Sequence, residues 1–214
     1  MSEQLSTRLR EGTKSVHRKA EQSGIMQDIL RRKITRGPYV LLLRNLVEVY
    51  EALEQAMREN ATHPGVSPLF FTELERVGPL EADLNALHGP TWRTDLPVLP
   101  GAKAYADRIR SVSKSSPALL AAHSYTRYLG DLSGGQILRK MLGEGLGLEG
   151  GNGTAFYDFP AIADPNSFKQ GYREALDKLP IGPTMADQVV AEAVQAFELN
   201  SRLFDEIATA PIAR

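Results

Sequence analysis

Cysteine is absent from this chain of 214 residues. Disulfides, iron–sulfur clusters, thiolate-ligated heme and cysteine nucleophiles are therefore excluded. An excess of one charge is also absent, because 25 basic residues are balanced by 26 acidic ones. Nucleic-acid-binding domains usually carry a clear positive excess, so we expect no nucleic-acid partner.

Long apolar runs are missing as well. The longest, residues 39–43 and 118–122, fall far short of the ~18 consecutive apolar residues that suggest a membrane span. The N-terminal residues, Met-Ser-Glu-Gln-Leu-Ser, lack the apolar core of a signal peptide. We therefore expect a soluble, cytoplasmic protein without a membrane anchor.

The chain does contain a clear helical period. Apolar residues recur at spacings of three and four in several stretches, whereas no alternating strand pattern or internal repeat is present. Residues 35–59 and 184–207 form the longest stripes, and the second is expected to begin with Thr184 as its N-cap. The sequence predicts an all-α protein with one domain over residues 1–214 and about eight helices.

One stretch, residues 124–140, has the pattern of a helix yet contains Gly130, Gly134 and Gly135. A glycine inside a helix costs roughly 1 kcal/mol relative to alanine. Gly130 and Gly134 share a face because they are four residues apart. Either a second group approaches the backbone closely there, which includes the ordinary packing of another helix, or the helix bends. We predict a break at Gly134-Gly135.

Polar residues crowd the same stretch and two of the stripes. Arg127 and Asp131 are four residues apart, and Tyr50 and Asn200 each interrupt an apolar stripe. A core tyrosine or amide that bonds to backbone would explain the last two. Phe197 lies one turn before Asn200.

The four histidines differ in context. His63 and His88 precede turn residues, and His123 follows two alanines as a plausible core residue. His17 lies well inside an amphipathic helix, four residues before Glu21. A carboxylate at that spacing can orient an imidazole, although a surface ion pair has the same spacing.

Two cations, Lys169 and Arg173, are four residues apart in a helix that should start at Asp164-Pro165. Without a carboxylate between them, they can clamp an anion. The alternative is an exposed basic edge.

The glycine-rich stretch strongly resembles the signature of the heme oxygenases, and the resemblance extends from about residue 9 to residue 207. It implies a helical heme oxygenase fold whose kinked glycine-rich helix crosses the distal face of the heme. It identifies His17 as the iron ligand with Glu21 as its support, and places Gly130, Gly134 and Gly135 against the heme. It further implies a distal network of Asp131, Arg127 and Tyr50, with Phe197 and Asn200 near the pocket. Propionate contacts are implied for Arg10, Tyr125, Lys169 and Arg173; Arg10 departs from the family pattern, which often has lysine there.

The resemblance also implies a reaction. Heme b would serve as substrate and cofactor and would be opened at the α-meso carbon to biliverdin IXα, CO and Fe(II), with O2 and an external reductant. Electrons would come from a ferredoxin or an NADPH-dependent reductase, and the protein is expected to be a monomer. The C-terminus, Ala-Pro-Ile-Ala-Arg, lacks the hydrophobic anchor of microsomal members, which favours a soluble bacterial type or an organellar, stromal one.

Two other classes are compatible with an all-α chain. A heme carrier or sensor would use the same pocket without turnover, but it needs no distal aspartate. A thiaminase-like enzyme of similar architecture would need a cysteine nucleophile, which this chain lacks.

Overall fold

The computed structural model describes residues 3–148 and 151–211. Within these residues the chain is helical and contains no strand. The α-helices are α1 (Leu5–Glu21), α2 (Gly24–Leu30), α3 (Arg36–Glu59), α4 (Val77–Leu87), α5 (Trp92–Asp95), α6 (Pro100–Ser115), α7 (Leu120–Ser124), α8 (Gly130–Leu146), α9 (Pro165–Asp177) and α10 (Pro183–Thr209). Short 3-10 turns connect several of them.

The prediction of an all-α fold with about eight helices is confirmed. In the described part of the chain, α5 is a single turn and α7 continues into α8, so eight longer helical segments remain. None of these helices is long and apolar enough to cross a bilayer.

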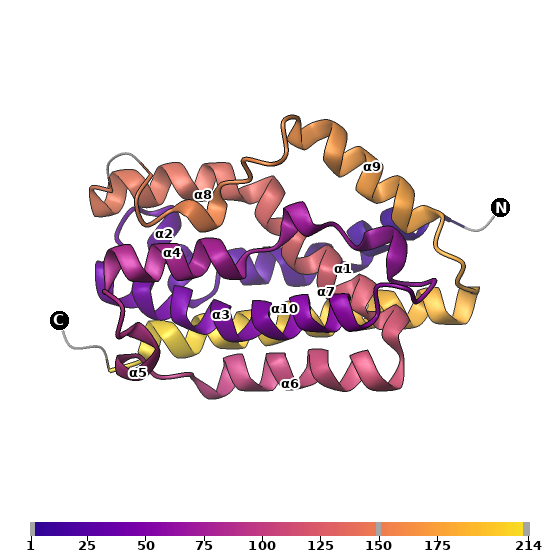
Figure 1. Cartoon of the computed structure of the whole chain (residues 1–214), viewed down its shortest axis with the longest axis horizontal. Coiled ribbons are helices and arrows are strands. Elements are labelled where there is room, and N and C mark those ends of the chain that lie inside the picture. The colour runs from indigo at the N-terminus through magenta and orange to yellow at the C-terminus, as the bar shows by residue number, and fades with distance from the viewer. Residues whose placement is uncertain (1–2, 149–150, 212–214) are drawn as a thin grey trace.

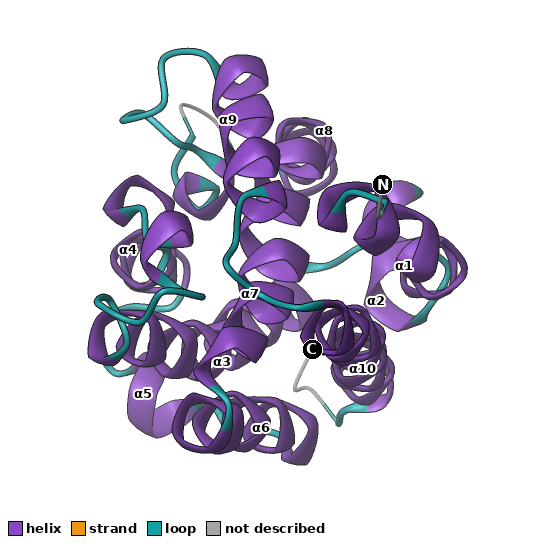
Figure 2. Ribbon diagram, turned by 90° about the vertical axis from the view of Figure 1, so that its right-hand side faces the viewer, coloured by secondary structure: helices purple, strands orange, loops and turns teal. Residues whose placement is uncertain are grey.

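The core is built around α3, α6 and α10. The long helix α10 contacts α1, α2, α6 and α7, while α3 contacts α4 and α6. Viewed along the molecule's long axis, α7 occupies the middle of the bundle, with the other helices around it (Figure 2). The predicted stripe of α3 is buried, including Tyr39, Leu43 and Leu53 at 0% exposure.

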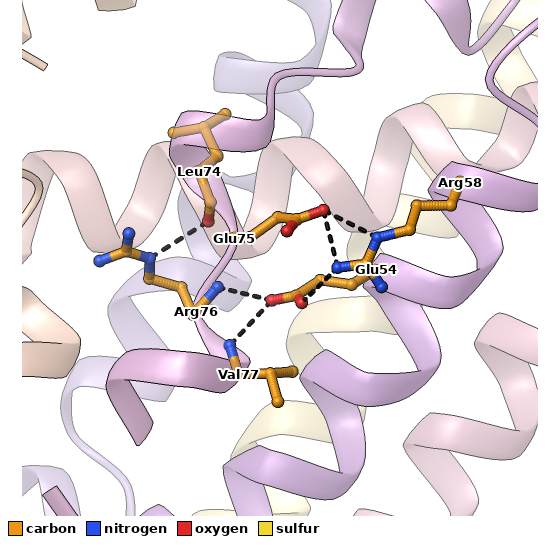
Figure 3. Close-up of polar contacts among 6 residues, drawn as sticks. All are labelled: Glu54, Arg58, Leu74, Glu75, Arg76 and Val77. Carbon is orange, nitrogen blue, oxygen red and sulfur yellow. Dashed lines mark hydrogen bonds and ion pairs between the residues drawn. The ribbon is translucent and has the colours of Figure 1, made fainter. Parts of the chain in front are cut away.

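A buried carboxylate joins α3 to the start of α4. Glu54, which is 3% exposed, accepts hydrogen bonds from the backbone N–H groups of Arg76 and Val77, with the latter at 2.9 Å (Figure 3). Arg58 completes the group by binding both Glu54 and Glu75. The leucine-rich pattern of residues 69–87 predicts one helix, but residues 69–76 form short turns, and α4 starts at Val77 with Pro79 in its first turn.

The glycine-rich helix departs from regular geometry, but not where the sequence predicted. Helix α8 passes through Gly134 and Gly135 without interruption, so the predicted break there was wrong. Instead, residues Tyr125–Leu129 form a π turn between α7 and α8. In Figure 1 the α8 end of this continuous ribbon lies at an angle to its α7 end.

Helix starts were predicted with mixed success. Asp164 does cap α9, because its carboxylate accepts hydrogen bonds from the N–H groups of Asn166 and Ser167. The start of α10 lies at Pro183, so Gly182 and not Thr184 is its N-cap.

Candidate active site

Two adjoining cavities lie between α1 and the segment formed by the π turn and α8. The first, of about 220 Å³, is also lined by Arg127, Asp131 and Asn200. The second, of about 450 Å³, is also lined by Arg10, Tyr125 and Arg173. Six residues line both: His17, Glu21, Thr126, Gly130, Gly134 and Phe197. Together the cavities fall within the roughly 300–1,000 Å³ typical of small-molecule sites.

His17 projects from α1 into this space. Its Nδ1 atom lies 3.6 Å from Glu21 Oε1, and its side chain is 51% exposed. The edge of the imidazole packs against Phe197, with 5.4 Å between ring centroids. The ring is therefore oriented by two neighbours but keeps an accessible nitrogen, which is what a metal ligand requires.

The face of α8 opposite His17 carries free space where side chains would normally stand. A Cβ atom built on Gly130 or Gly134 would meet nothing within 4 Å. Gly135 differs, because a Cβ atom there would stand 3.3 Å from Cδ1 of Tyr157. Gly130 and Gly134 thus open the cavities, whereas Gly135 is buried and makes room for Tyr157.

A polar cluster borders the first cavity. The hydroxyl of Tyr50 donates to Asp131, and Arg127 Nη2 lies 3.3 Å from the other carboxylate oxygen of Asp131. Arg127 also donates from Nε to Tyr50 Oη at 3.1 Å and from Nη1 to Asn200 Oδ1 at 2.8 Å. Four side chains from α3, the π turn, α8 and α10 therefore form one hydrogen-bonded group.

Burial controls the protonation of this cluster. The side chain of Asp131 is only 12% exposed, and desolvation raises the pKa of its carboxyl well above the usual value. Asp131 therefore holds a proton to higher pH than an exposed aspartate does. A carboxyl that holds its proton more tightly in this way can serve as a proton donor to a group in the cavity.

Cationic residues gather at the second cavity. Arg10 and Arg173 both line it, together with Tyr125. Burial raises the pKa of Tyr125, and the positive charges of Arg173 and Arg10 act in the opposite direction, so the three groups are close to one another. Lys169, one turn before Arg173 on α9, lines neither cavity.

Several lining residues were not singled out by the sequence. Leu30 and Ile137 line the first cavity, and they are the exposed large apolar side chains of the described chain, at 38% and 59%. Exposed apolar groups at the mouth of a cavity suggest an apolar ligand. Phe156 and Tyr157 also line this cavity, although nothing in the local sequence signals that they do.

Comparisons with known proteins agree with this geometry. The family model described as heme oxygenase matches residues 3–206. Heme oxygenase 1 of Nostoc sp. is 43% identical over 97% of this chain and 87% of that protein.

Two solved structures are similar in both fold and sequence. The heme oxygenase of Leptospira interrogans has a TM-score of 0.93 and 41% identity, covering 95% of this chain and 100% of that chain. Heme oxygenase-1 from the cyanobacterium Synechocystis sp., solved in complex with heme, has a TM-score of 0.92 and 44% identity, covering 95% of this chain and 92% of that chain. The chain therefore belongs to the heme oxygenase family of heme-degrading oxidoreductases.

Proposed function

We propose that this protein binds heme b between α1 and α8 and opens it at the α-meso carbon. The products are biliverdin IXα, CO and Fe(II), and the reaction uses O2 and electrons from an external donor. The observation that carries the proposal is the empty face of Gly130 and Gly134 opposite His17 in one cavity. A planar macrocycle fits between an imidazole on one side and a helix without side chains on the other.

The residues present suit this ligand. His17 would bind the iron through its accessible ring nitrogen, with Glu21 and Phe197 orienting the ring. The apolar side chains Leu30 and Ile137 would cover the edges of the macrocycle. The heme supplies the iron that activates O2 and the meso carbon that is oxidised.

The propionates carry negative charge and belong at the cationic second cavity. Arg10 and Arg173 line it beside the hydroxyl of Tyr125, and charge-assisted hydrogen bonds to a carboxylate are among the strongest that side chains make. These contacts would fix the in-plane rotation of the heme and hence which meso carbon is cleaved. The structure gives Lys169 no comparable place, so its propionate contact stays a prediction.

The buried polar cluster supplies protons on the glycine side. Asp131, held by Tyr50 and Arg127, can pass a proton into the first cavity and recover it through this network. Asn200 holds Arg127 from the far side. A heme carrier or sensor needs no such group, so the cluster favours turnover over storage.

A combined binding and turnover assay tests the proposal. Hemin is added to the purified protein, the visible spectrum is recorded, and a ferredoxin or an NADPH-dependent reductase is supplied in air. We expect a stoichiometric hemin complex and biliverdin as product. A complex that persists without biliverdin with either donor would identify a carrier and contradict the proposal.

The glycine face can be tested separately with Gly134→Leu. Glycine is roughly 0.8–1 kcal/mol less favourable in a helix than alanine, and leucine ranks close to alanine; a Cβ atom at Gly134 meets nothing within 4 Å. The heme-free variant should therefore be at least as stable as the wild type while losing hemin binding. Unchanged hemin affinity would show that the ligand lies elsewhere.

The two cations of α9 provide a matched pair for regiochemistry. Arg173→Ala should produce a measurable share of β or δ biliverdin. The variant loses a charge-assisted contact worth roughly 1.5–3 kcal/mol that favours one in-plane orientation of the heme. Lys169→Ala should leak less, since Lys169 lines neither cavity. Chromatography of the biliverdin isomers measures both. Equal leakage from the two variants would restore the predicted role of Lys169.

A further inference from the structure

The wall segment, residues 153–159, closes one side of the first cavity. It contains a 3-10 turn, Ala155–Tyr157, and no α-helix. Phe156 and Tyr157 line the cavity from this segment, although they are 1% and 3% exposed. The ring of Tyr157 fills the space left by Gly135 of α8. The position of this short segment therefore sets the position of one wall of the cavity.

The carboxylate of Asp83 holds the segment by its backbone. Asp83 lies on α4 and is 1% exposed. Its Oδ1 accepts the N–H of Ala155 at 2.8 Å, and its Oδ2 accepts the N–H of Phe156 at 2.8 Å. Burial raises the pKa of Asp83, and these backbone hydrogen bonds oppose that rise. Both oxygens are therefore engaged by the turn that carries the two aromatic rings.

Other side chains hold the rest of the segment. Tyr39 donates from its hydroxyl to the carbonyl of Gly153 at 2.7 Å. Arg76, which is 4% exposed, donates to the carbonyl of Asp158 at 2.5 Å and stacks on the ring of Phe159 with 3.9 Å to the centroid. Arg76 also donates to the carbonyl of Phe156 at 3.4 Å, whereas Asp83 binds the N–H groups of Phe156 and of the residue before it.

The wall segment also reaches the polar cluster. Burial raises the pKa of Tyr157, and the nearby charge of Asp131 adds to that rise, so the phenol stands close to the carboxyl. Phe156 packs edge-on against Tyr50, with 5.5 Å between ring centroids. A shift of the wall would therefore move two neighbours of the groups that handle protons.

We propose that Asp83 is a positioning residue for heme cleavage, which holds Phe156 and Tyr157 against the heme pocket through the amides of the wall segment. The proposal rests on the proposed function, because the wall matters only if the cavity holds a macrocycle. Asp83 itself lines neither of the two cavities. It acts through the backbone, as a fixed point on the rigid helix α4.

Asp83→Asn tests this directly. Asparagine has the same shape but only one acceptor oxygen, so either Ala155 or Phe156 loses its partner and faces an N–H group instead. In the heme-free variant we expect the amides of Ala155 and Phe156 to exchange with deuterium about ten- to a hundredfold faster, as one unmade buried hydrogen bond implies. In the hemin complex we expect weaker hemin affinity and a larger share of β or δ biliverdin.

Ile109→Ala serves as the stability control. Ile109 is a fully buried residue of α6, and no residue of α6 lines either cavity. It should lower global stability without changing hemin affinity or the isomer ratio. If it changes them as much as Asp83→Asn does at equal loss of stability, Asp83 has no positioning role.

The other possible results of this experiment also test the proposal. Faster exchange with unchanged affinity and isomers would show that Asp83 stabilises the segment only and would overturn the proposal. If Asp83→Asn does not fold, Tyr39→Phe removes one hydrogen bond from the same segment and should shift exchange and isomers in the same direction. Failure of the wild type to bind hemin would instead contradict the proposed function. The exchange measurement would then still show whether Asp83 holds the backbone of the wall segment.

Discussion

Two histidine–glutamate pairs occupy opposite environments in this molecule. On α1, His17 and Glu21 lie 3.6 Å apart with side chains 51% and 54% exposed. In the bundle interior, His123 Nε2 and Glu192 Oε1 lie 2.9 Å apart with side chains 0% and 4% exposed. The residue types are the same, but the interior pair also includes Arg108, which donates from Nε to Glu192 at 2.9 Å.

The difference teaches which histidine can bind a ligand. The imidazole of His123 is bonded to Glu192 and enclosed by the core, and its ring centroid lies 5.7 Å from that of Tyr105. It therefore has no room for a ligand. Burial would raise the pKa of Glu192, but hydrogen bonds from His123 and Arg108 outweigh it and lower the pKa to about 2. The interior pair therefore stabilises the fold. The exposed pair contributes little stability, and the half-exposed imidazole of His17 remains accessible.

The largest effect is expected from His17→Ala. It should reduce biliverdin formation by more than about a hundredfold, because the variant would lack the side chain proposed to bind the heme iron. The unfolding free energy of the heme-free protein should hardly change because the imidazole is half exposed. Turnover and the spectrum of the hemin complex measure this, and a variant that retains both would transfer the ligand role away from His17.

The converse variant, Glu192→Ala, should damage stability and spare chemistry. Removing one partner of a buried ion pair typically costs about 3–5 kcal/mol, and Glu192 is 4% exposed. Urea unfolding of the heme-free protein gives this value directly. The fraction that remains folded should still bind hemin through His17. A loss below 1 kcal/mol would mean that the interior pair is no more important than the surface one.

Acidification should sharpen the same contrast. The pKa of Glu192 falls from the usual 4.5 to about 2 on folding, which corresponds to about 3 kcal/mol at 1.36 kcal/mol per unit. Because the folded pKa is lower than the unfolded one, this stability is fully present above pH 4.5 and is lost as the pH falls towards 2. Glu192→Gln should flatten the stability profile in that window. An equally steep profile in the variant would assign the acid sensitivity to other carboxylates.

The smallest effect is expected from Glu21→Gln. An exposed ion pair contributes roughly 0–1 kcal/mol, so the unfolding free energy should stay within that range of the wild type. Hemin affinity should fall modestly, because the amide still contacts the imidazole but no longer carries charge. Comparing urea midpoints and hemin titrations separates the two. A stability loss as large as that of Glu192→Ala would erase the distinction between the pairs.

Local patterns predicted the helices well because helical periodicity and caps depend on residues a few positions apart. The buried stripe of α3 and the cap at Asp164 follow from such signals. The predictions that His17 lies in a helix beside Glu21 and that His123 is a core residue rested on similarly local context, and the structure has both.

The wrong prediction at the site itself concerns glycine. A glycine reports that a side chain is missing, but not what fills the space. At Gly135 the space is taken by Tyr157, which lies 22 positions later in the chain, so the helix continues without a break. The irregular turn falls instead on Tyr125–Leu129, where ordinary helix residues give no warning.

The wall of the cavity depends on contacts far apart in sequence. Ala155 and Phe156 are held by Asp83, at sequence separations of 72 and 73. No periodic pattern in a single sequence encodes such a pairing. The separation of Arg173 from Lys169 is likewise a matter of where α9 lies relative to α1, which spacing along one helix does not determine.

The π turn also sets the rotational phase of the whole site. Its hydrogen bonds span five residues instead of four, so the chain carries one residue more than an uninterrupted helix would at this point. Each residue of an α-helix turns by about 100°. If Tyr125–Leu129 formed regular α-helix with no residue removed, every later side chain would therefore be displaced around the axis by about that angle. Gly130, Gly134 and Asp131 would then face away from His17 together. The register of this one turn, more than any single side chain, aligns the glycine face with the imidazole across the cavity.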